Sequence, residues 1–147
     1  MFKRSALRAH ATAAMHLKDA AGKPMFFTPA AAAPGEEVKK LPVLITLHGP
    51  GSEVNLNAQQ DAKRRLLAWA KDSGKDLQSR DPAQRAGDVA DVLAAITAGV
   101  DGLDLEGKSV SAGVRDLYAD PLCGYIVDQV NAFAADWANF SNGAPKA

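Results

Sequence analysis

The hydrophobic pattern of the chain changes sharply at residues 49–51, and this change constrains the fold more than any other feature. Pro42 to Leu47 is a short apolar run with β-branched residues, which is typical of a buried strand. Gly49-Pro50-Gly51 stops the run, and from Ser52 onward the apolar residues recur at helical spacing. The sequence therefore predicts a strand, a tight turn and then helices.

Two more strands are predicted before this turn. Residues 11–17 and 25–28 flank a turn-rich segment at 18–24 (KDAAGKP), a pattern typical of a hairpin. Residues 29–40 combine proline, alanine and charge, and we expect an exposed, mobile loop there. Residues 1–51 should therefore form a β-rich N-terminal part.

Four helices are predicted in residues 52–140. The first has Ser52 as its N-cap, ends at Gly74, and should place one apolar stripe against the core. The second begins at Asp81-Pro82, its stripe continues to Val100, and Gly99 and Gly102 close it. The stripe of the first helix consists of Val54, Ala58, Ala62, Leu66 and Trp69.

Two more helices are predicted, a short one before Asp120-Pro121 and a longer one after it. Residues 103–108 should be a short extended piece with a turn at Gly107, after which Ser111 caps a short helix. Asp120-Pro121 starts the last helix, which is predicted to reach Phe140, and residues 141–147 should be a flexible tail. The predicted fold class is α+β, a single domain over 1–147 with a small N-terminal β-hairpin or sheet followed by a bundle of about four helices.

The charges balance overall but are unevenly distributed. The chain has 17 basic and 17 acidic residues, so no global positive field favours nucleic-acid binding. Residues 1–40 carry a net charge of +4, which leaves −4 on the remainder. Ordinary solvated charges are the favoured explanation, and weak head-to-tail self-association or an acidic partner is the alternative. No apolar run approaches the roughly 20 residues that cross a bilayer, and the single Cys123 cannot form an internal disulfide.

Catalytic and metal-binding motifs are incomplete. The strand that ends in His48-Gly49 resembles the oxyanion strand of α/β-hydrolases, but the chain has no Gly-x-Ser-x-Gly nucleophile elbow. Gly49-Pro50-Gly51-Ser52 before a helix could cradle a phosphate, yet the P-loop lysine is missing and a capped turn is favoured. The acids between Asp101 and Glu106 and the three histidines lack metal-ligand spacing. No cofactor is expected.

The aromatic stripe of the last helix is the remaining candidate site. Such a stripe either fills the core or offers anchors to a partner's groove, and base rates favour the core. The candidate partner-binding residues are Leu122, Tyr125, Ile126, Phe133, Trp137 and Phe140.

Three blocks of the chain resemble the tail assembly chaperones of long-tailed bacteriophages and prophages. Residues 42–52 with the polar helix 53–71 resemble the family's strand, Gly-Pro turn and capped helix. Residues 99–110 resemble its acidic, glycine-rich connector, with Val100 where the family carries tryptophan. Residues 117–121, 126–130 and 133–140 resemble its closing helix.

This resemblance implies a non-catalytic chaperone that coats the tape-measure protein and recruits tail-tube subunits in the host cytoplasm. It also implies absence from the finished virion. A minor tail or connector protein retained in the virion is the alternative, and a small hydrolase around His48 and Ser52 is a third. The family often makes a longer product by a programmed frameshift, and Ala144-Pro145-Lys146 permits, without requiring, codons on which ribosomes slip back one nucleotide.

Overall fold

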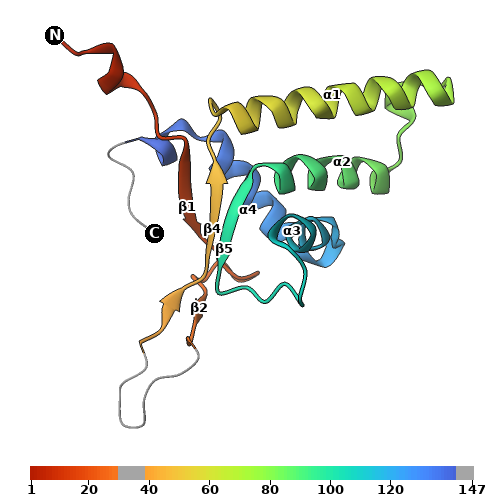
Figure 1. Cartoon of the computed structure of the whole chain (residues 1–147). Helices are drawn as coiled ribbons and strands as arrows, with labels where there is room; N and C mark the ends of the chain where they lie inside the picture. Colours follow the sequence, from red (N-terminus) through yellow and green to blue (C-terminus); the bar gives the residue numbers. More distant parts are fainter. Residues whose placement is uncertain (30–38, 142–147) are drawn as a thin grey trace.

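A three-stranded antiparallel sheet lies at the centre of the fold in the computed structural model, which describes residues 1–29 and 39–141. The strands are β1 (Thr12–His16), β4 (Leu44–His48) and β5 (Thr97–Asp101), in the order β1-β4-β5 (Figure 1). The chain thus has the predicted α+β fold, with an antiparallel sheet and four helices.

The central strand β4 supplies the middle of the core. Its side chains alternate: Ile45 and Leu47 are buried, as is Val43 just before the strand, while the residues between them are only partly covered. Burying each of these apolar side chains contributes roughly 1.5–3 kcal/mol. The predicted strand at 42–47 is therefore confirmed within one or two residues.

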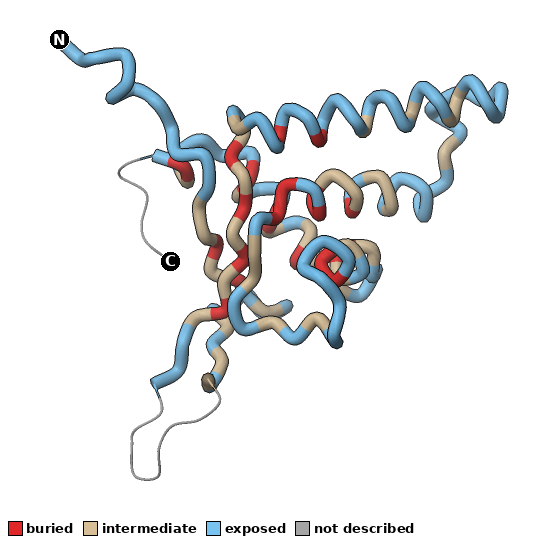
Figure 2. Tube along the Cα trace, in the orientation of Figure 1, coloured by how far each residue is buried: buried red, intermediate tan, exposed pale blue. Residues whose placement is uncertain are grey.

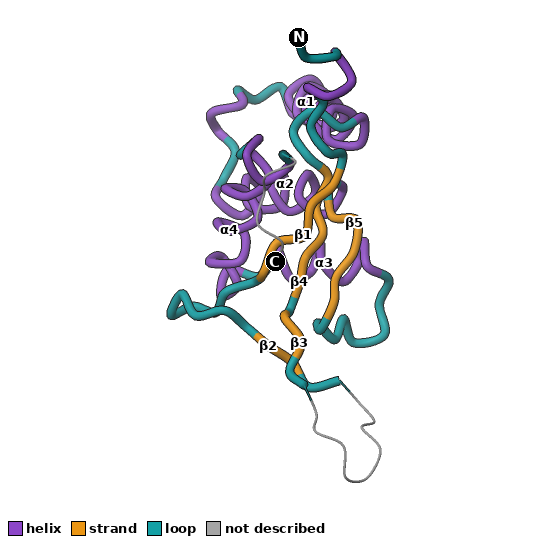
Figure 3. Tube along the Cα trace, turned by 90° about the vertical axis from the view of Figure 1, so that its left-hand side faces the viewer, coloured by secondary structure: helices purple, strands orange, loops and turns teal. Residues whose placement is uncertain are grey.

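Helices α2 (Pro82–Ala95), α3 (Val110–Ala119) and α4 (Gly124–Ala135) lie on one side of the sheet (Figures 1 and 3). Their inward residues join those of the strands in one core. The buried helical members of that core are Ala90, Leu93, Ala94, Val114, Tyr118, Ile126, Val130 and Ala134.

Helix α1 (Glu53–Ser73) runs beside α2 and projects away from the sheet (Figure 1). The Ser52 side chain accepts a hydrogen bond from the Asn55 amide, which makes it the predicted N-cap. Gly74 ends the helix with a φ of 68°, a left-handed conformation that glycine adopts without a steric penalty. Both predicted ends of this helix are confirmed.

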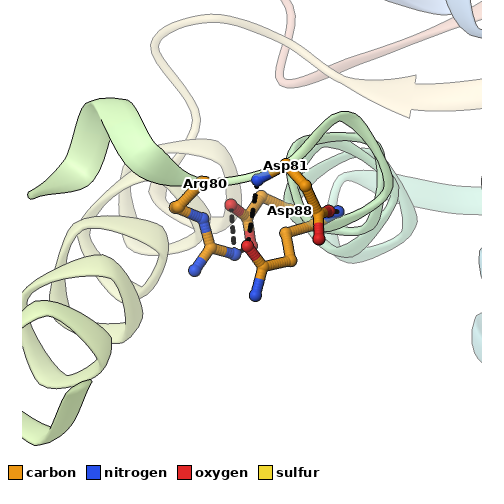
Figure 4. A network of polar contacts seen from close by, with 4 residues as sticks. Arg80, Asp81 and Asp88 are labelled. Atoms are coloured by element: carbon orange, nitrogen blue, oxygen red, sulfur yellow. Dashed lines mark hydrogen bonds and ion pairs between the residues drawn. The ribbon is translucent and has the colours of Figure 1, made fainter. Parts of the chain in front are cut away.

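The link between α1 and α2 is held by a charged network around Arg80 (Figure 4). Arg80 Nη2 donates to Asp88 Oδ1 at 2.8 Å, and its guanidinium carbon lies 4.7 Å from the ring centre of Trp69 in α1. Asp81 and Gln84 form the capping box that starts α2. Arg80 therefore connects the two helices through one contact on each.

The predicted N-terminal hairpin is only partly correct. The chain does reverse at 18–24, where Lys18 and Pro24 form an isolated bridge. The two strands beside the turn do not pair with each other, however. Strand β1 pairs with β4, while β2 (Phe26–Phe27) pairs with β3 (Leu41–Pro42) in a separate two-stranded sheet. The two sheets meet where Leu17 N donates to Val43 O (2.9 Å), Val43 N to Met25 O (3.0 Å) and Met25 N to Leu17 O (2.9 Å).

The predicted continuation of the second helix to Val100 is wrong. Helix α2 ends at Ala95, and residues 97–101 form β5, which pairs with the free side of β4. The Thr97 hydroxyl donates to Leu93 O at 2.8 Å and so satisfies a carbonyl at the end of the helix. Pairing with β4 outweighs the helical pattern of these residues. The sheet therefore includes a strand from the part of the chain that was predicted to be helical.

The last two predicted helices have different limits in the structure. Ser109, rather than Ser111, is the N-cap of α3. The predicted single helix from Asp120 to Phe140 divides into η3 (Pro121–Cys123), α4 and η4 (Trp137–Phe140), with a break at Asp136. The Asp136 side chain accepts from the Ala138 amide and thereby starts a new turn.

Residues 103–108 form no strand, although the predicted turn is present. It lies at Glu106 and Gly107, which both have positive φ. Two more short 3-10 turns are η1 (Arg4–Leu7) and η2 (Leu77–Ser79). Most of the predicted loop at 29–40 and of the tail at 141–147, with Ala144-Pro145-Lys146, lies outside the described residues. Within the described ranges, no helix combines the length and apolar character needed to cross a membrane.

Candidate functional site

Three segments meet at the end of β4 to form the main candidate surface. They are the turn at 49–52, the N-terminal residues 8–12 and η4. His10 N donates to Phe140 O at 2.6 Å, and Gly49 N donates to Ala11 O at 2.7 Å. These backbone hydrogen bonds connect the start of the chain, the central turn and the closing segment.

The two glycines of the turn allow two aromatic rings to lie directly against the backbone. A Cβ atom on Gly49 would be 2.8 Å from Phe140 Cδ1, and one on Gly51 would be 2.7 Å from Trp137 Cη2. Both distances are shorter than ordinary van der Waals contact. Glycine is therefore needed at both positions for the closing segment to pack as it does.

Phe140 and Trp137 differ strongly in exposure although they belong to the same short turn. Phe140 is fully buried, and its ring meets Phe133 edge to face at a centroid distance of 5.7 Å. Trp137 remains 57% exposed. The indole is thus supported on one side by Gly51 and open to solvent on the other, which is the arrangement of a preorganised aromatic anchor.

A groove with a volume of about 540 Å³ lies beside Trp137. It is open rather than enclosed, and its walls combine apolar side chains with imidazole, hydroxyl and guanidinium groups. Its lining includes Arg8, His10, His48, Ser52, Val54 and Trp137.

The Ser52 hydroxyl in the groove is occupied by local hydrogen bonds. Ser52 Oγ donates its proton to Gly49 O at 2.8 Å and accepts from Asn55 N at 3.2 Å. Asn55 Nδ2 in turn donates to His48 O at 3.4 Å. The Ser52 hydroxyl acts as a turn and helix cap, a role that opposes its use as a nucleophile activated by His48.

The other residues considered for metal binding are dispersed or engaged in turns. His10 and His48 both line the groove, whereas the His16 Nε2 atom lies 2.8 Å from Met25 O and its ring contacts Phe26. Asp104 Oδ1 accepts from Glu106 N at 2.8 Å, as expected for solvated acids at a turn. No group of three or more potential ligands occurs among residues 1–29 and 39–141.

The six predicted partner-binding residues do not form one surface. Ile126 and Phe140 are buried, so they belong to the core. Tyr125 and Phe133 are partly buried and pack against that core. Only Leu122, at 87% exposure, and Trp137 present most of their side chain to solvent.

Burial lowers the reactivity of the only thiol in the chain. It raises the pKa of Cys123 above its ordinary value, and the negative charge of Asp120 and a hydrogen bond to it act in the same direction. A smaller thiolate fraction makes this cysteine a weak nucleophile and a weak metal ligand.

The exposed leucines of α1 were not among the predicted site residues. Leu56 and Leu67 are 58% and 65% exposed and lie on the side of the helix opposite the predicted stripe. Their separation of 11 residues, about three helical turns, was a usable signal. The role of Arg8 and His10 in the groove had no such signal, because it depends on the path of the N-terminal segment.

No protein-family model matches the chain, and no curated protein or solved structure is significantly similar to it.

Proposed function

We propose that this chain is a tail assembly chaperone of a long-tailed phage or prophage, and that Trp137 is its main anchor for the tape-measure protein. The observation that carries the proposal is the half-exposed indole held against Gly51 beside an open groove. Tryptophan and arginine dominate the energetics of protein interfaces, and a supported ring has little side-chain entropy to lose on binding.

The contacts of Trp137 and Phe140 relate directly to the sequence resemblance. The first resembling block contains Gly49 and Gly51, and the third contains both aromatic residues. These blocks are far apart in sequence but contact each other through the two rings. The contact between the first and third blocks supports a common role for them, because the turn at Gly51 positions Trp137, the proposed anchor.

The groove suits an apolar side chain of a helical partner. Val54, which is 39% exposed, and Trp137 provide apolar contact area, while Arg8 and Glu53, which also line the groove, can pair with a partner's charges. A long tape-measure protein presents repeated apolar helical faces that must be covered before the tail tube surrounds them. A small chaperone that acts in the host cytoplasm and recruits tube subunits would leave before the virion is complete.

Co-purification with the tape-measure protein tests this function. The variant Trp137→Ala should lose binding while its thermal transition stays close to that of the wild type, since the ring is more than half exposed. Leu122→Ala, which truncates an even more exposed side chain elsewhere, is the matched control and should bind normally. Normal binding by Trp137→Ala would refute the assigned anchor.

Two further measurements separate the proposal from a structural tail protein. Mass spectrometry of purified virions should not detect the chain, whereas a minor tail or connector protein would remain. A very long, helix-rich reading frame immediately downstream of the gene is also expected.

The proposed frameshift is tested by the gene sequence. Slippage requires a CCA codon for Pro145 and an AAA or AAG codon for Lys146. Other synonymous codons would exclude slippage at this site without affecting the chaperone proposal.

A further inference from the structure

The outer face of α1 carries two exposed leucines, Leu56 and Leu67. Leu56 and Leu67 lie about three turns apart and therefore on the same face. Gln60 and Lys63 fall between them, which gives 4-3-4 spacing, the spacing of a coiled-coil seam. These four residues are the outer seam of α1. Both leucines are more than half exposed.

The opposite face of α1 already has its partner within the chain. Ala58 is buried, and Leu66 and Trp69 are partly buried on the side of α2. Figure 2 shows that the rest of the helix is mainly exposed, apart from this inner side. A second helix could therefore pack on the outer seam without displacing anything in the described parts of the chain.

The seam is complementary to itself when its direction is reversed. In an antiparallel pair centred between Asp61 and Ala62, Leu56 faces Leu67 of the other copy and Gln60 faces its Lys63. Each contact occurs twice because the two-fold axis repeats it, as in other isologous dimers. A parallel pair in register would instead place Lys63 against Lys63.

The charges of α1 favour the same antiparallel arrangement. Residues 53–62 have a net charge of −2, whereas residues 63–73 have a net charge of +3. Reversing one copy places the acidic half of each helix beside the basic half of the other, and also opposes the two helix dipoles. We propose that the outer seam of α1 binds the α1 helix of a second copy of this chain in an antiparallel coiled coil.

This dimer is independent of the Trp137 surface and of the proposed function. It also differs from the self-association predicted from the basic N-terminal residues, because its contacts lie entirely within α1. Only two leucine pairs form per dimer, so a weak, concentration-dependent equilibrium is expected.

Analytical ultracentrifugation of the full chain tests the seam. The wild type should shift from monomer to dimer as concentration rises, and Leu56→Gln with Leu67→Gln should weaken the dimer about tenfold or more. Glutamine preserves charge and helix propensity, and circular dichroism should confirm an unchanged fold. Leu122→Gln is the control and should dimerise normally. A wild type that stays monomeric, or a double variant that dimerises normally, would overturn the proposal.

Cross-linking tests the direction of the helices. In a Cys123→Ser background, a mixture of Gln60→Cys and Lys63→Cys chains should give more product with a short thiol cross-linker than either chain alone. The reason is that residue 60 faces residue 63 in the antiparallel pair, while identical residues are offset by about 4.5 Å along the axis. Preferential 60-to-60 or 63-to-63 products would show a different arrangement and reject this one.

Discussion

Helix α1 is longer than helix α4 but buries fewer residues. Helix α1 has 21 residues but only two buried ones, Asn55 and Ala58. Helix α4 has 12 residues and buries three, Ile126, Val130 and Ala134, against the core. Figure 2 shows that α1 is mainly exposed. The shorter helix therefore stabilises the fold through apolar packing, while the longer one depends on its caps and on contacts with α2.

The apolar residues of segment 122–140 and those of helix α1 have different roles. The most aromatic segment, 122–140, mainly fills the core, and Trp137 is the member that both stays exposed and lines the groove. The polar helix α1, by contrast, carries two exposed leucines in a regular pattern. Strength of the apolar pattern indicates core packing here, whereas a sparse regular pattern on a polar helix indicates a surface for association.

The largest expected effect is at Phe140, where the closing segment meets the core. Phe140→Ala should lower the free energy of unfolding by about 3–5 kcal/mol, because it empties a fully buried site. Trp137→Ala, in the same turn, should cost about 1 kcal/mol, since the ring is more than half exposed. Urea denaturation of both variants measures the difference. Equal losses would mean that exposure does not separate core from anchor in this turn.

The elements that depend on local signals are predictable from the sequence. Ser52, Gly74 and Asp81-Pro82 define helix ends through side-chain caps, a left-handed glycine and a fixed proline φ, and all three act as predicted. The central strand was also predicted, because its apolar run is short and bounded by glycine. These features need only neighbouring residues to form.

Two errors were local, since Ser109 and not Ser111 caps α3 and the Asp136 side chain starts a new turn within the predicted last helix. The errors in strand pairing occurred where distant residues decide the structure. Residues 97–101 fit a helical stripe, but they form β5 because β4 has a free side that needs backbone partners. Likewise, residues 12–16 pair with β4 instead of completing a hairpin. At the candidate site, the sequence identified Trp137 but not its contact with Gly51, because 86 residues separate them.

Arg80 offers an intermediate test on the α1 side of the comparison. Arg80→Ala removes the hydrogen bond to Asp88 and the contact with the Trp69 ring, so it should cost about 1–3 kcal/mol. Hydrogen exchange should accelerate in α1 and not in α4. The control Arg64→Ala breaks an exposed pair with Asp61 and should change stability by less than about 0.5 kcal/mol. Faster exchange throughout the molecule would contradict a local role.

The smallest expected effect concerns a polar contact inside the core, which contrasts with the peripheral Arg80 network. The Tyr118 hydroxyl of α3 lies 2.8 Å from Thr97 Oγ1 at the start of β5, and both residues are buried. Tyr118→Phe removes this hydrogen bond but leaves the one from Thr97 to Leu93 O. The loss should be about 0.5–1.5 kcal/mol near neutral pH.

The pH dependence of Tyr118→Phe distinguishes this core contact from the charged one. Burial raises the pKa of the Tyr118 phenol above its ordinary value of 10.0, and the hydrogen bond to Thr97 only partly opposes that rise. Its contribution to stability is therefore fully present below pH 10.0 and is lost as the pH rises through the higher folded-state pKa. Wild-type stability should fall more steeply than that of Tyr118→Phe above this pH. Denaturation at a series of alkaline pH values measures the difference, and parallel curves would show that the phenol is not buried as the structure places it.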